Sequence, residues 1–288
     1  MPKVGYKMSL TPMKQMLIKA RHDGNAVGAF EFWSYDSARA VIEAAEARRV
    51  PVILQVGHFE RDYMGGYPNA YRIASMAAEH ALVPVALHLD HADSYGEVLL
   101  ALEAGFTSVM IDASARSFED NIYITSQVVR LAAQYGATVE AELGQLLGNE
   151  GNVVSANALT DPDSAAEFVA RTGVDALAVA IGTAHGFYKE TPHIDIDRLK
   201  QIAAKVAIPL VLHGGSGTPD EAVRQAIKCG ISKVNICTEF ICAMGREMQR
   251  VQQEGITYNV MTLFNAGKEA GKKLASEKIE LFTPNIGR

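Results

Sequence analysis

The segment VPVALHLDHADS, residues 83–94, joins a short apolar run to a cluster of titratable side chains. An apolar run of about four to eight residues is typical of a strand buried on both faces, as in a parallel sheet covered by helices. Seven other runs of this kind, rich in Val, Ile, Leu and Ala, occur along the chain. The eight predicted strands are 26–30, 52–56, 84–89, 108–111, 138–141, 176–181, 209–213 and 233–236.

Segments with apolar residues three or four positions apart separate the predicted strands and indicate amphipathic helices. Examples are residues 37–49, 95–104, 121–135, 162–172 and 219–229. The pairs Asp161–Pro162 and Thr218–Pro219 are typical of an N-cap followed by a first helical residue. The glycines expected to end helices in the left-handed conformation are Gly105, Gly136, Gly173 and Gly230.

Eight strand and helix units in about 250 residues predict a (β/α)8 TIM barrel. An additional helix at residues 8–21 and a helical C-terminal tail from Glu239 onward would flank it. A doubly wound open sheet is the alternative, but no GxGxxG motif follows an early strand. Because no linker or low-complexity segment interrupts the pattern, we expect residues 1–288 to form one domain.

The composition excludes several classes of partner. A net charge of −6 and a pI near 5.8 argue against nucleic acid or an anionic membrane as the main partner. Cys229, Cys237 and Cys242 show no CxxC spacing, which disfavours disulfides or a cysteine zinc site and favours a reducing cytoplasm. We find neither a secretory signal nor an uncharged apolar run of about 18 residues, so a soluble cytoplasmic protein is expected.

The residues that follow each predicted strand indicate the function, because the active site of a TIM barrel lies at the C-terminal ends of its strands. His91, His185 and His213 follow strands three, six and seven, as a catalytic zinc site with an open fourth position requires. Each histidine alone is better explained as a hydrogen-bonded structural residue, and only the three together favour a metal. We assign His88 a structural role, because strand alternation sends it to the face opposite its neighbours. The histidines expected at the surface are His22, His80 and His193.

Glycine-rich turns after strands six and seven indicate a phosphate site. Exposed backbone N–H groups in such turns, together with a helix N-terminus, can hold a phosphate group. Tight turns without a ligand are the alternative. The candidate phosphate-binding or substrate-binding residues are Gly186, Gly214, Gly215, Ser216, Asn235, Ile236, Cys237 and Thr238.

Six motifs, in order along the chain, resemble those of the class II, metal-dependent ketose-bisphosphate aldolases, the fructose and tagatose bisphosphate type. The resemblance is closer to the tagatose-type branch, since a threonine-glutamate pair, here Thr238–Glu239, ends the eighth strand. The motifs are HLDHA at 88–92, SVMIDAS at 108–114, VEAELGQ at 139–145, AVAIGTAHG at 178–186, PLVLHGGSG at 209–217 and KVNICTE at 233–239.

The resemblance implies an aldolase that reversibly cleaves a ketose 1-phosphate or bisphosphate into dihydroxyacetone phosphate and an aldehyde. His91, His185 and His213 would bind a catalytic zinc ion, which would stabilise an enediolate intermediate. Asp90 would exchange a proton with the C4 hydroxyl, and Glu150 would handle the C3 proton.

The resemblance also implies supporting groups and partners. Asp112 and Glu142 match positions that hold a second metal in some members, although hydrogen-bonded support of the zinc ligands is the better reading. A monovalent cation, Na⁺ or K⁺, would assist at the phosphate. The partners implied are a sugar phosphate and further copies of the chain, as a dimer or tetramer.

The aldehyde side departs from the family pattern. Family members commonly have asparagine after the first strand and, when specific for bisphosphates, a serine after the second strand and an arginine in the C-terminal region. Here Glu31 and Gly57 stand at the first two places, and residues 255–271 contain no arginine. Because a glutamate would repel a second phosphate, we expect an aldehyde half without one. The residues expected to recognise it are Glu31, Trp33, Gln55, His58 and Arg61.

Three rival readings fit the sequence less well. A Schiff-base aldolase needs a lysine at an inner strand end, and Lys233 is expected at the start of the eighth strand. A metal-dependent amidohydrolase would show HxH on the first strand, where this chain has AFEF. A non-catalytic sugar-phosphate-binding barrel, or a supporting subunit of an aldolase complex, would not be expected to keep Asp90 and all three histidines.

Overall fold

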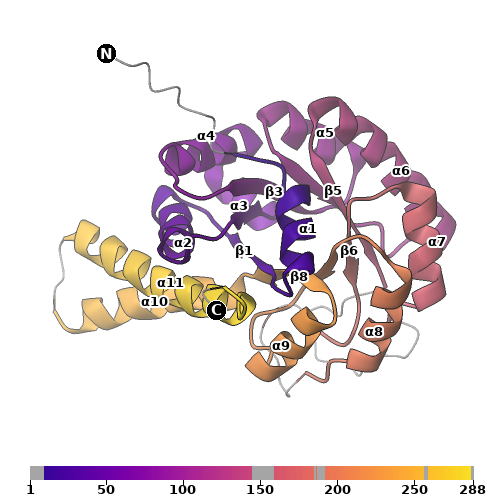
Figure 1. The fold of residues 1–288 in the computed structure, drawn as a ribbon. Helices are drawn as coiled ribbons and strands as arrows, with labels where there is room; N and C mark the ends of the chain where they lie inside the picture. The colour runs from indigo at the N-terminus through magenta and orange to yellow at the C-terminus, as the bar shows by residue number, and fades with distance from the viewer. Residues whose placement is uncertain (1–9, 145–158, 185, 187–191, 256–258, 287–288) are drawn as a thin grey trace, which may run out of the picture.

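The computed structural model describes residues 10–144, 159–184, 186, 192–255 and 259–286. Eight parallel strands close into a barrel in chain order, so that β1 pairs with both β2 and β8. Helices surround this barrel (Figure 1), which confirms the predicted (β/α)8 TIM barrel. The strands are β1 Val27–Glu31, β2 Val52–Val56, β3 Val85–Ala92, β4 Ser108–Ile111, β5 Thr138–Leu143, β6 Ala176–Val179, β7 Leu210–Leu212 and β8 Ile231–Ile236.

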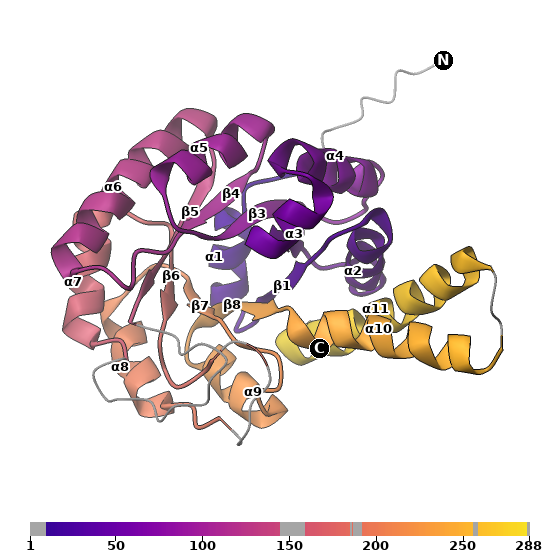
Figure 2. The same ribbon diagram turned by 180° about the vertical axis from the view of Figure 1, so that it is seen from behind.

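The helices run from one end of the described chain to the other, and none of them combines the length and apolar character that a membrane crossing requires. In Figure 2, α10 and α11 extend away from the ring of helices as an antiparallel pair, which confirms the helical C-terminal tail. The helices are α1 Lys14–His22, α2 Tyr35–Arg48, α3 His58–Met64, α4 Tyr67–Ala78, α5 Tyr95–Ala104, α6 Phe118–Tyr135, α7 Pro162–Thr172, α8 Ile196–Lys205, α9 Asp220–Lys228, α10 Thr238–Gln253 and α11 Val260–Phe282.

The additional N-terminal helix is shorter than predicted. α1 begins at Lys14, because the residues before it pair with a strand: Leu10 forms a bridge with Val85, and the Thr11 amide donates to the Val85 carbonyl oxygen at 2.8 Å. The first two residues of the predicted helix, Met8 and Ser9, lie outside the described residues.

Helix ends follow the predicted pattern with one exception. Asp161 caps α7 by accepting a hydrogen bond from the Ser164 amide, and Gly105, Gly136 and Gly173 end their helices in the left-handed conformation. The second N-cap prediction is wrong, because α9 begins after Pro219 without a side-chain cap. The Thr218 hydroxyl instead donates to the Gly214 carbonyl oxygen of the same turn.

Strand alternation makes the barrel interior apolar at one end and polar at the other. Near the N-terminal ends of the strands, Leu17 of α1 packs in one cluster with Ala29 and Ile53. Two positions further along the same strands, the buried residues are Glu31 and Gln55. Polar groups therefore gather toward the C-terminal ends, where the site was expected.

The position predicted for Lys233 is wrong. β8 begins at Ile231, so Lys233 is the third residue of the strand and is fully buried. Its amine lies 2.8 Å from Glu140 Oε2 and exposes no surface to a substrate carbonyl. Because its amine is already paired with Glu140 and has no exposed surface, the structure gives no support to a Schiff-base role for Lys233.

Candidate active site

His91 turns into the barrel because the backbone breaks the alternation of β3. Strict alternation would place Asp90 inward and His91 outward. His91 instead adopts φ +48°, in the left-handed region, and the pairing of β3 with β4 shifts register between Leu89 and Ala92. Only Arg49 shares a positive φ among the described residues that are not glycine. A non-glycine residue held in this conformation is a feature that often marks functional sites.

The rings of His91 and His213 meet nearly at right angles at the mouth of the barrel. His91 Nε2 lies 2.8 Å from His213 Nδ1, and the ring centroids are 4.7 Å apart. The other nitrogen of each ring meets a carboxylate: His91 Nδ1 lies 2.9 Å from Asp112 Oδ2, and His213 Nε2 lies 2.8 Å from Glu140 Oε1. Because a carboxylate can only accept, the ring nitrogens beside Asp112 and Glu140 carry the protons.

Two nitrogen lone pairs at this separation repel one another unless a proton or a metal ion lies between them. Burial lowers the pKa of His91, but the carboxylates of Asp90, Asp112 and Glu142 more than offset it, and the pKa rises to about 9. The Asp112 pKa falls well below its usual range, because its bonds to His91 and Ser114 outweigh the effect of burial. The two rings thus meet in a strongly acidic setting.

Among the described residues, three groups of ligand atoms could hold a metal ion: one is His58, Asp93 and Glu97, and the other two both contain His91. Asp90, His91 and His213 each offer an atom within 4.8 Å of the others, and so do His91, Asp112 and Glu142. Two of the predicted site residues, His185 and Glu150, lie outside the described residues. The structure brings together every described member of the predicted metal site.

Asp90 is held by two amide groups. Its side chain is largely buried, with Asn235 Nδ2 3.2 Å from Oδ1 and Gln55 Nε2 3.3 Å from Oδ2. His91 Nε2 is 4.0 Å from Oδ2. The carboxylate is therefore fixed next to the candidate metal ligand His91, as a general acid or base would have to be.

Glu31 lies on the other side of Gln55, and its pKa is raised well above the usual range. Burial is the main cause, followed by the negative charges of Asp90 and Glu60. Gln55 Nε2 donates to Glu31 Oε1 at 3.0 Å, and the Gly57 amide donates to Oε2 at 3.3 Å. The raised pKa weakens the expected reason for excluding a second phosphate, because a protonated carboxyl does not repel an anion as a carboxylate does.

The glycine turn after β7 is shaped by close packing. A Cβ at Gly214, where φ is +66°, would lie 2.3 Å from the Ala184 carbonyl oxygen. The Gly215 amide already donates to the Asn235 carbonyl oxygen at 3.1 Å, and the Cys237 amide donates to Ser216 Oγ at 3.3 Å. Two of the predicted phosphate donors are therefore engaged within the protein.

Comparison with known proteins adds the family to this geometry. Residues 11–285 match the family described as Fructose-bisphosphate aldolase class-II. The chain belongs to this family of metal-dependent carbon–carbon lyases. The fructose-bisphosphate aldolase of Geobacillus stearothermophilus is 40% identical over 279 residues, covering 96% of this chain and 97% of that protein. That of Staphylococcus epidermidis is 38% identical over 279 residues, covering 96% and 98%.

A solved structure of the YdjI aldolase from Escherichia coli K12 is similar over the same span. It is 35% identical in sequence, covers 96% of this chain and 98% of that chain, and superposes with a TM-score of 0.86. The family implies a divalent metal, and the cluster around His91 is where this aldolase would hold it.

His58 and Arg61 do not join the aldehyde side of the aldolase site as expected. Both contact the carboxylate of Glu97: His58 Nε2 at 2.9 Å and Arg61 Nη1 at 2.5 Å. They line a cavity of about 1170 Å³ between α3, α4 and α5. Trp33 packs edge-on against Phe240 at 5.7 Å between ring centroids. Of the five predicted residues, the structure gathers only two, Glu31 and Gln55, beside Asp90.

Sequence reasoning assigned no site role to Glu60, Glu97 or Glu140. Spacing could have indicated Glu140, because it stands two positions before Glu142 on β5 and therefore faces the same way. Glu60 and Glu97 lie on helices, and nothing in their local sequence marks them.

His88 is fully buried and makes a hydrogen bond between Nδ1 and Ser108 Oγ at 2.6 Å, as a structural residue would. Strand alternation alone does not explain this role, since His88 lies on the same face of β3 as Asp90. His88 Nε2 is 3.9 Å from Asp90 Oδ1. Depth separates them: His88 lies further into the barrel. Burial, followed by the charge of Lys233, lowers the His88 pKa well below its usual value.

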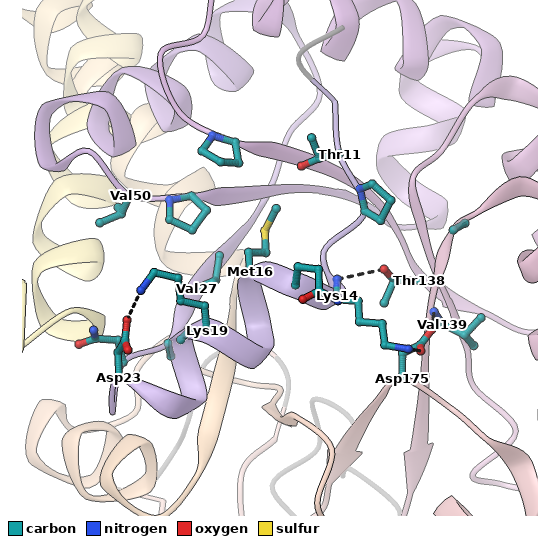
Figure 3. A pocket seen from close by; sticks show the side chains of 18 of the residues that line it. Thr11, Lys14, Met16, Lys19, Asp23, Val27, Val50, Thr138, Val139 and Asp175 are labelled. Atoms are coloured by element: carbon teal, nitrogen blue, oxygen red, sulfur yellow. Dashed lines mark hydrogen bonds and ion pairs between the residues drawn. The ribbon is translucent and has the colours of Figure 1, made fainter. Parts of the chain in front are cut away.

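A separate cavity of about 880 Å³ lies at the N-terminal end of the barrel, next to α1 (Figure 3). Its charged side chains pair with one another, as Lys14 does with Asp175 at 2.7 Å and Lys19 with Asp23 at 2.6 Å. Among the described residues that line it there is no histidine. This end of the aldolase therefore lacks the groups of the candidate active site.

Proposed function

We propose that this protein is a zinc-dependent class II aldolase that reversibly cleaves a ketose 1-phosphate into dihydroxyacetone phosphate and an aldehyde. The observation that carries the proposal is the convergence of His91 Nε2 and His213 Nδ1 beside Asp90 in a member of this family. Closer kinship to the tagatose-type branch stays a prediction.

The residues present fit a divalent transition metal. Two imidazoles each point one ring nitrogen at the same place, and each donates its other N–H to a carboxylate, an arrangement typical of histidine ligands. His91 and His213 would hold the ion, with His185 as the expected third ligand. A zinc ion there would act as a Lewis acid toward the substrate carbonyl group. Asp112 and Glu142 would serve as hydrogen-bonding support, or as ligands of a second ion.

Asp90 would carry the proton of the C4 hydroxyl. As the C3–C4 bond breaks, the carboxylate accepts this proton and the C4 carbon becomes the aldehyde carbonyl. Asn235 and Gln55 keep the two carboxylate oxygens in place. In the reverse direction, Asp90 returns the proton to the new hydroxyl oxygen. Return of a proton to C3 stays assigned to Glu150.

The phosphate of the substrate would bind between the turn after β7 and the start of α10. α10 is a helix of 16 residues whose first residue is Thr238, so its N-terminus favours an anion. Because the amides of Gly215 and Cys237 are engaged, we assign the phosphate chiefly to Ser216, Thr238 and the neighbouring backbone. A Na⁺ or K⁺ ion would assist there.

The aldehyde half would carry no phosphate. Among the described residues, the charged neighbours that shift the Glu31 pKa are acidic, namely Asp90 and Glu60. Arg61, the arginine predicted for this side of the site, is held by Glu97 and by Asp62. This setting supports a neutral polyhydroxy aldehyde, which a protonated Glu31 and the Gln55 amide could bind through its hydroxyl groups.

We also propose that the protein acts as a cytoplasmic homo-oligomer, a dimer or tetramer. A cavity of about 570 Å³ between α3, α10 and α11 is lined by exposed aromatic side chains, which supports a contact between copies at this face. The aromatic residues concerned are Phe59, Tyr63 and Phe264.

The test is a screen of ketose 1-phosphates and ketose bisphosphates for release of dihydroxyacetone phosphate. We expect the highest kcat/KM for a ketose 1-phosphate whose aldehyde half lacks phosphate, and loss of release with Asp90→Asn. Fructose or tagatose bisphosphate as the best substrate would refute the proposed aldehyde half. Absence of release from every ketose phosphate by metal-loaded protein would refute the proposed activity.

A further inference from the structure

Lys233 and Glu140 form an ion pair in the interior of the barrel. Both side chains are fully buried, and Lys233 Nζ lies 2.8 Å from Glu140 Oε2. The metal binding and the proton transfer proposed above do not use Lys233. A lysine and a glutamate without any exposed surface are uncommon unless each is paired, because an isolated charge is strongly disfavoured there.

Glu140 divides its two oxygens between different partners. Oε2 accepts from Lys233, and Oε1 accepts from the Nε2–H group of His213 at 2.8 Å. A carboxylate bound at both oxygens cannot rotate without breaking one of these bonds. The ammonium group of Lys233 therefore fixes the orientation in which Glu140 meets His213.

The orientation of Glu140 decides which nitrogen of His213 faces the metal site. With the proton on Nε2, the lone pair lies on Nδ1, and Nδ1 is the atom that points to His91 Nε2 at 2.8 Å. If the proton were on Nδ1 instead, Nδ1 could not bind a metal ion. The Glu140 carboxylate would then face the lone pair of Nε2, to which it cannot donate a hydrogen bond. The Asn235 amide nitrogen lies further from Nε2, at 3.4 Å, so the carboxylate at 2.8 Å sets both the tautomer and the tilt of the ring.

The far side of Lys233 is also held. His88 Nε2 lies 3.4 Å from Lys233 Nζ, and His88 Nδ1 lies 2.6 Å from Ser108 Oγ. The amine is thus placed between His88 and Glu140. Residues of β3, β4, β5 and β8 are linked with His213, which directly follows β7, in one chain of polar contacts. Such a chain leaves His213 little freedom to turn.

We propose that Lys233 is a positioning residue for the metal site, which acts by holding Glu140 in the one orientation that keeps His213 Nδ1 available as a ligand. This inference rests on the metal site of the proposed function. It assigns Lys233 no contact with substrate, and it gives the buried lysine a role that Schiff-base chemistry does not.

The test compares zinc affinity in four proteins: wild type, Lys233→Met, Glu140→Gln and the double variant Lys233→Met/Glu140→Gln. Affinity is measured by competition with a chromophoric chelator, and ligand geometry by the visible absorption bands of the Co²⁺-loaded proteins. We expect the zinc dissociation constant to rise about 10-fold to 100-fold in each single variant, the range found for partners of metal-bound histidines. The visible absorption bands of the Co²⁺-loaded single variants should also shift relative to those of wild type.

The double variant separates positioning from folding. It leaves no unpaired charge in the barrel, so its melting temperature should recover toward that of wild type even if a single variant folds poorly. Its zinc affinity should stay at least about 10-fold weaker, because no ammonium group fixes the amide that faces His213. Arg39→Met is the matched control, since it removes a partly buried cation paired with Glu43 and Glu46 on α2, away from the site.

The outcomes separate the positioning role of Lys233 from the proposed metal site. Wild-type zinc affinity in Lys233→Met, or in the double variant, would overturn the positioning role while leaving the proposed function intact. Wild-type protein that binds zinc no more tightly than His213→Ala would overturn the proposed metal site, and the positioning role with it. Equal weakening in Arg39→Met would show a general effect of lost ion pairs and would also overturn the inference.

Discussion

Replacement of Glu31 by glutamine should make the protein progressively more stable than wild type as the pH rises. Glu31 is buried, and its pKa in the folded protein lies well above the usual value of 4.5, because of burial and the charges of Asp90 and Glu60. Below pH 4.5, Glu31 keeps its proton in both the folded and the unfolded chain. Above it, the unfolded chain loses the proton while the folded protein keeps it, so stability falls as the pH rises toward the folded pKa.

The size of the effect follows from this difference in bound protons. One proton corresponds to about 1.4 kcal/mol per pH unit in the free energy of unfolding. Glutamine keeps the shape of Glu31 without titrating, so the variant lacks this loss. The stability of Glu31→Gln minus that of wild type should therefore grow by up to about 1.4 kcal/mol for each pH unit between 4.5 and the folded pKa of Glu31.

The assay is equilibrium unfolding by urea at about pH 5, 6 and 7, with both proteins at equal metal content. Glu43→Gln is the control. Glu43 binds Lys268 and Lys272, and its pKa is lowered, so its contribution to stability is lost only as the pH falls below the usual value of 4.5. Its difference from wild type should stay constant over this range. A constant difference for Glu31→Gln as well would show that Glu31 is already ionised, and our account of its environment would be wrong.

Three further predictions concern the site and its turn. Asp90→Asn should lower kcat by about 100-fold or more at unchanged zinc content, measured by release of dihydroxyacetone phosphate together with metal analysis. Asp112→Asn should weaken zinc binding by about 10-fold to 100-fold in a chelator competition, because His91 loses its carboxylate partner; unchanged affinity would contradict that role. Gly214→Ala should lower the free energy of unfolding by more than about 1 kcal/mol, because φ is +66° and a backbone oxygen blocks the new Cβ. Gly245→Ala, in open space on α10, should instead raise it by about 0.5–1 kcal/mol in the same urea titration.

The fold was largely predictable because its signals are local and repeat. Two of the predicted strands, 52–56 and 108–111, coincide with β2 and β4, and the helix predicted at 95–104 coincides with α5. The region between β2 and β3 was not predicted. Gly65 and Gly66 divide it into two short helices, α3 and α4, neither of which repeats the pattern of one long helix between strands.

The candidate site was predictable only in part, since strand ends can be read from the sequence and contacts across the barrel cannot. His91 and His213 were assigned from their places after strands, and Asp90 from the family resemblance. His58 and Arg61, which follow the second strand, were expected to act together with Glu31, but a buried carboxylate on α5, Glu97, contacts both. No local pattern indicates such a partner.

The pair between Lys233 and Glu140 was missed for a related reason. It depends on the register of β8 and on the shear of a closed barrel, which bring strands five and eight to face each other across the interior. A start of β8 placed two residues too late was enough to hide the inward position of the lysine.

The central claim is tested most directly by a zinc titration of chelator-stripped protein, with release of dihydroxyacetone phosphate from the best ketose 1-phosphate as the readout. Our account predicts almost no release before zinc is added, and a rate that rises until about one zinc ion per chain is bound. His213→Ala should show no such rise. Release at the full rate from the stripped protein, or an equal response to zinc in His213→Ala, would contradict the account.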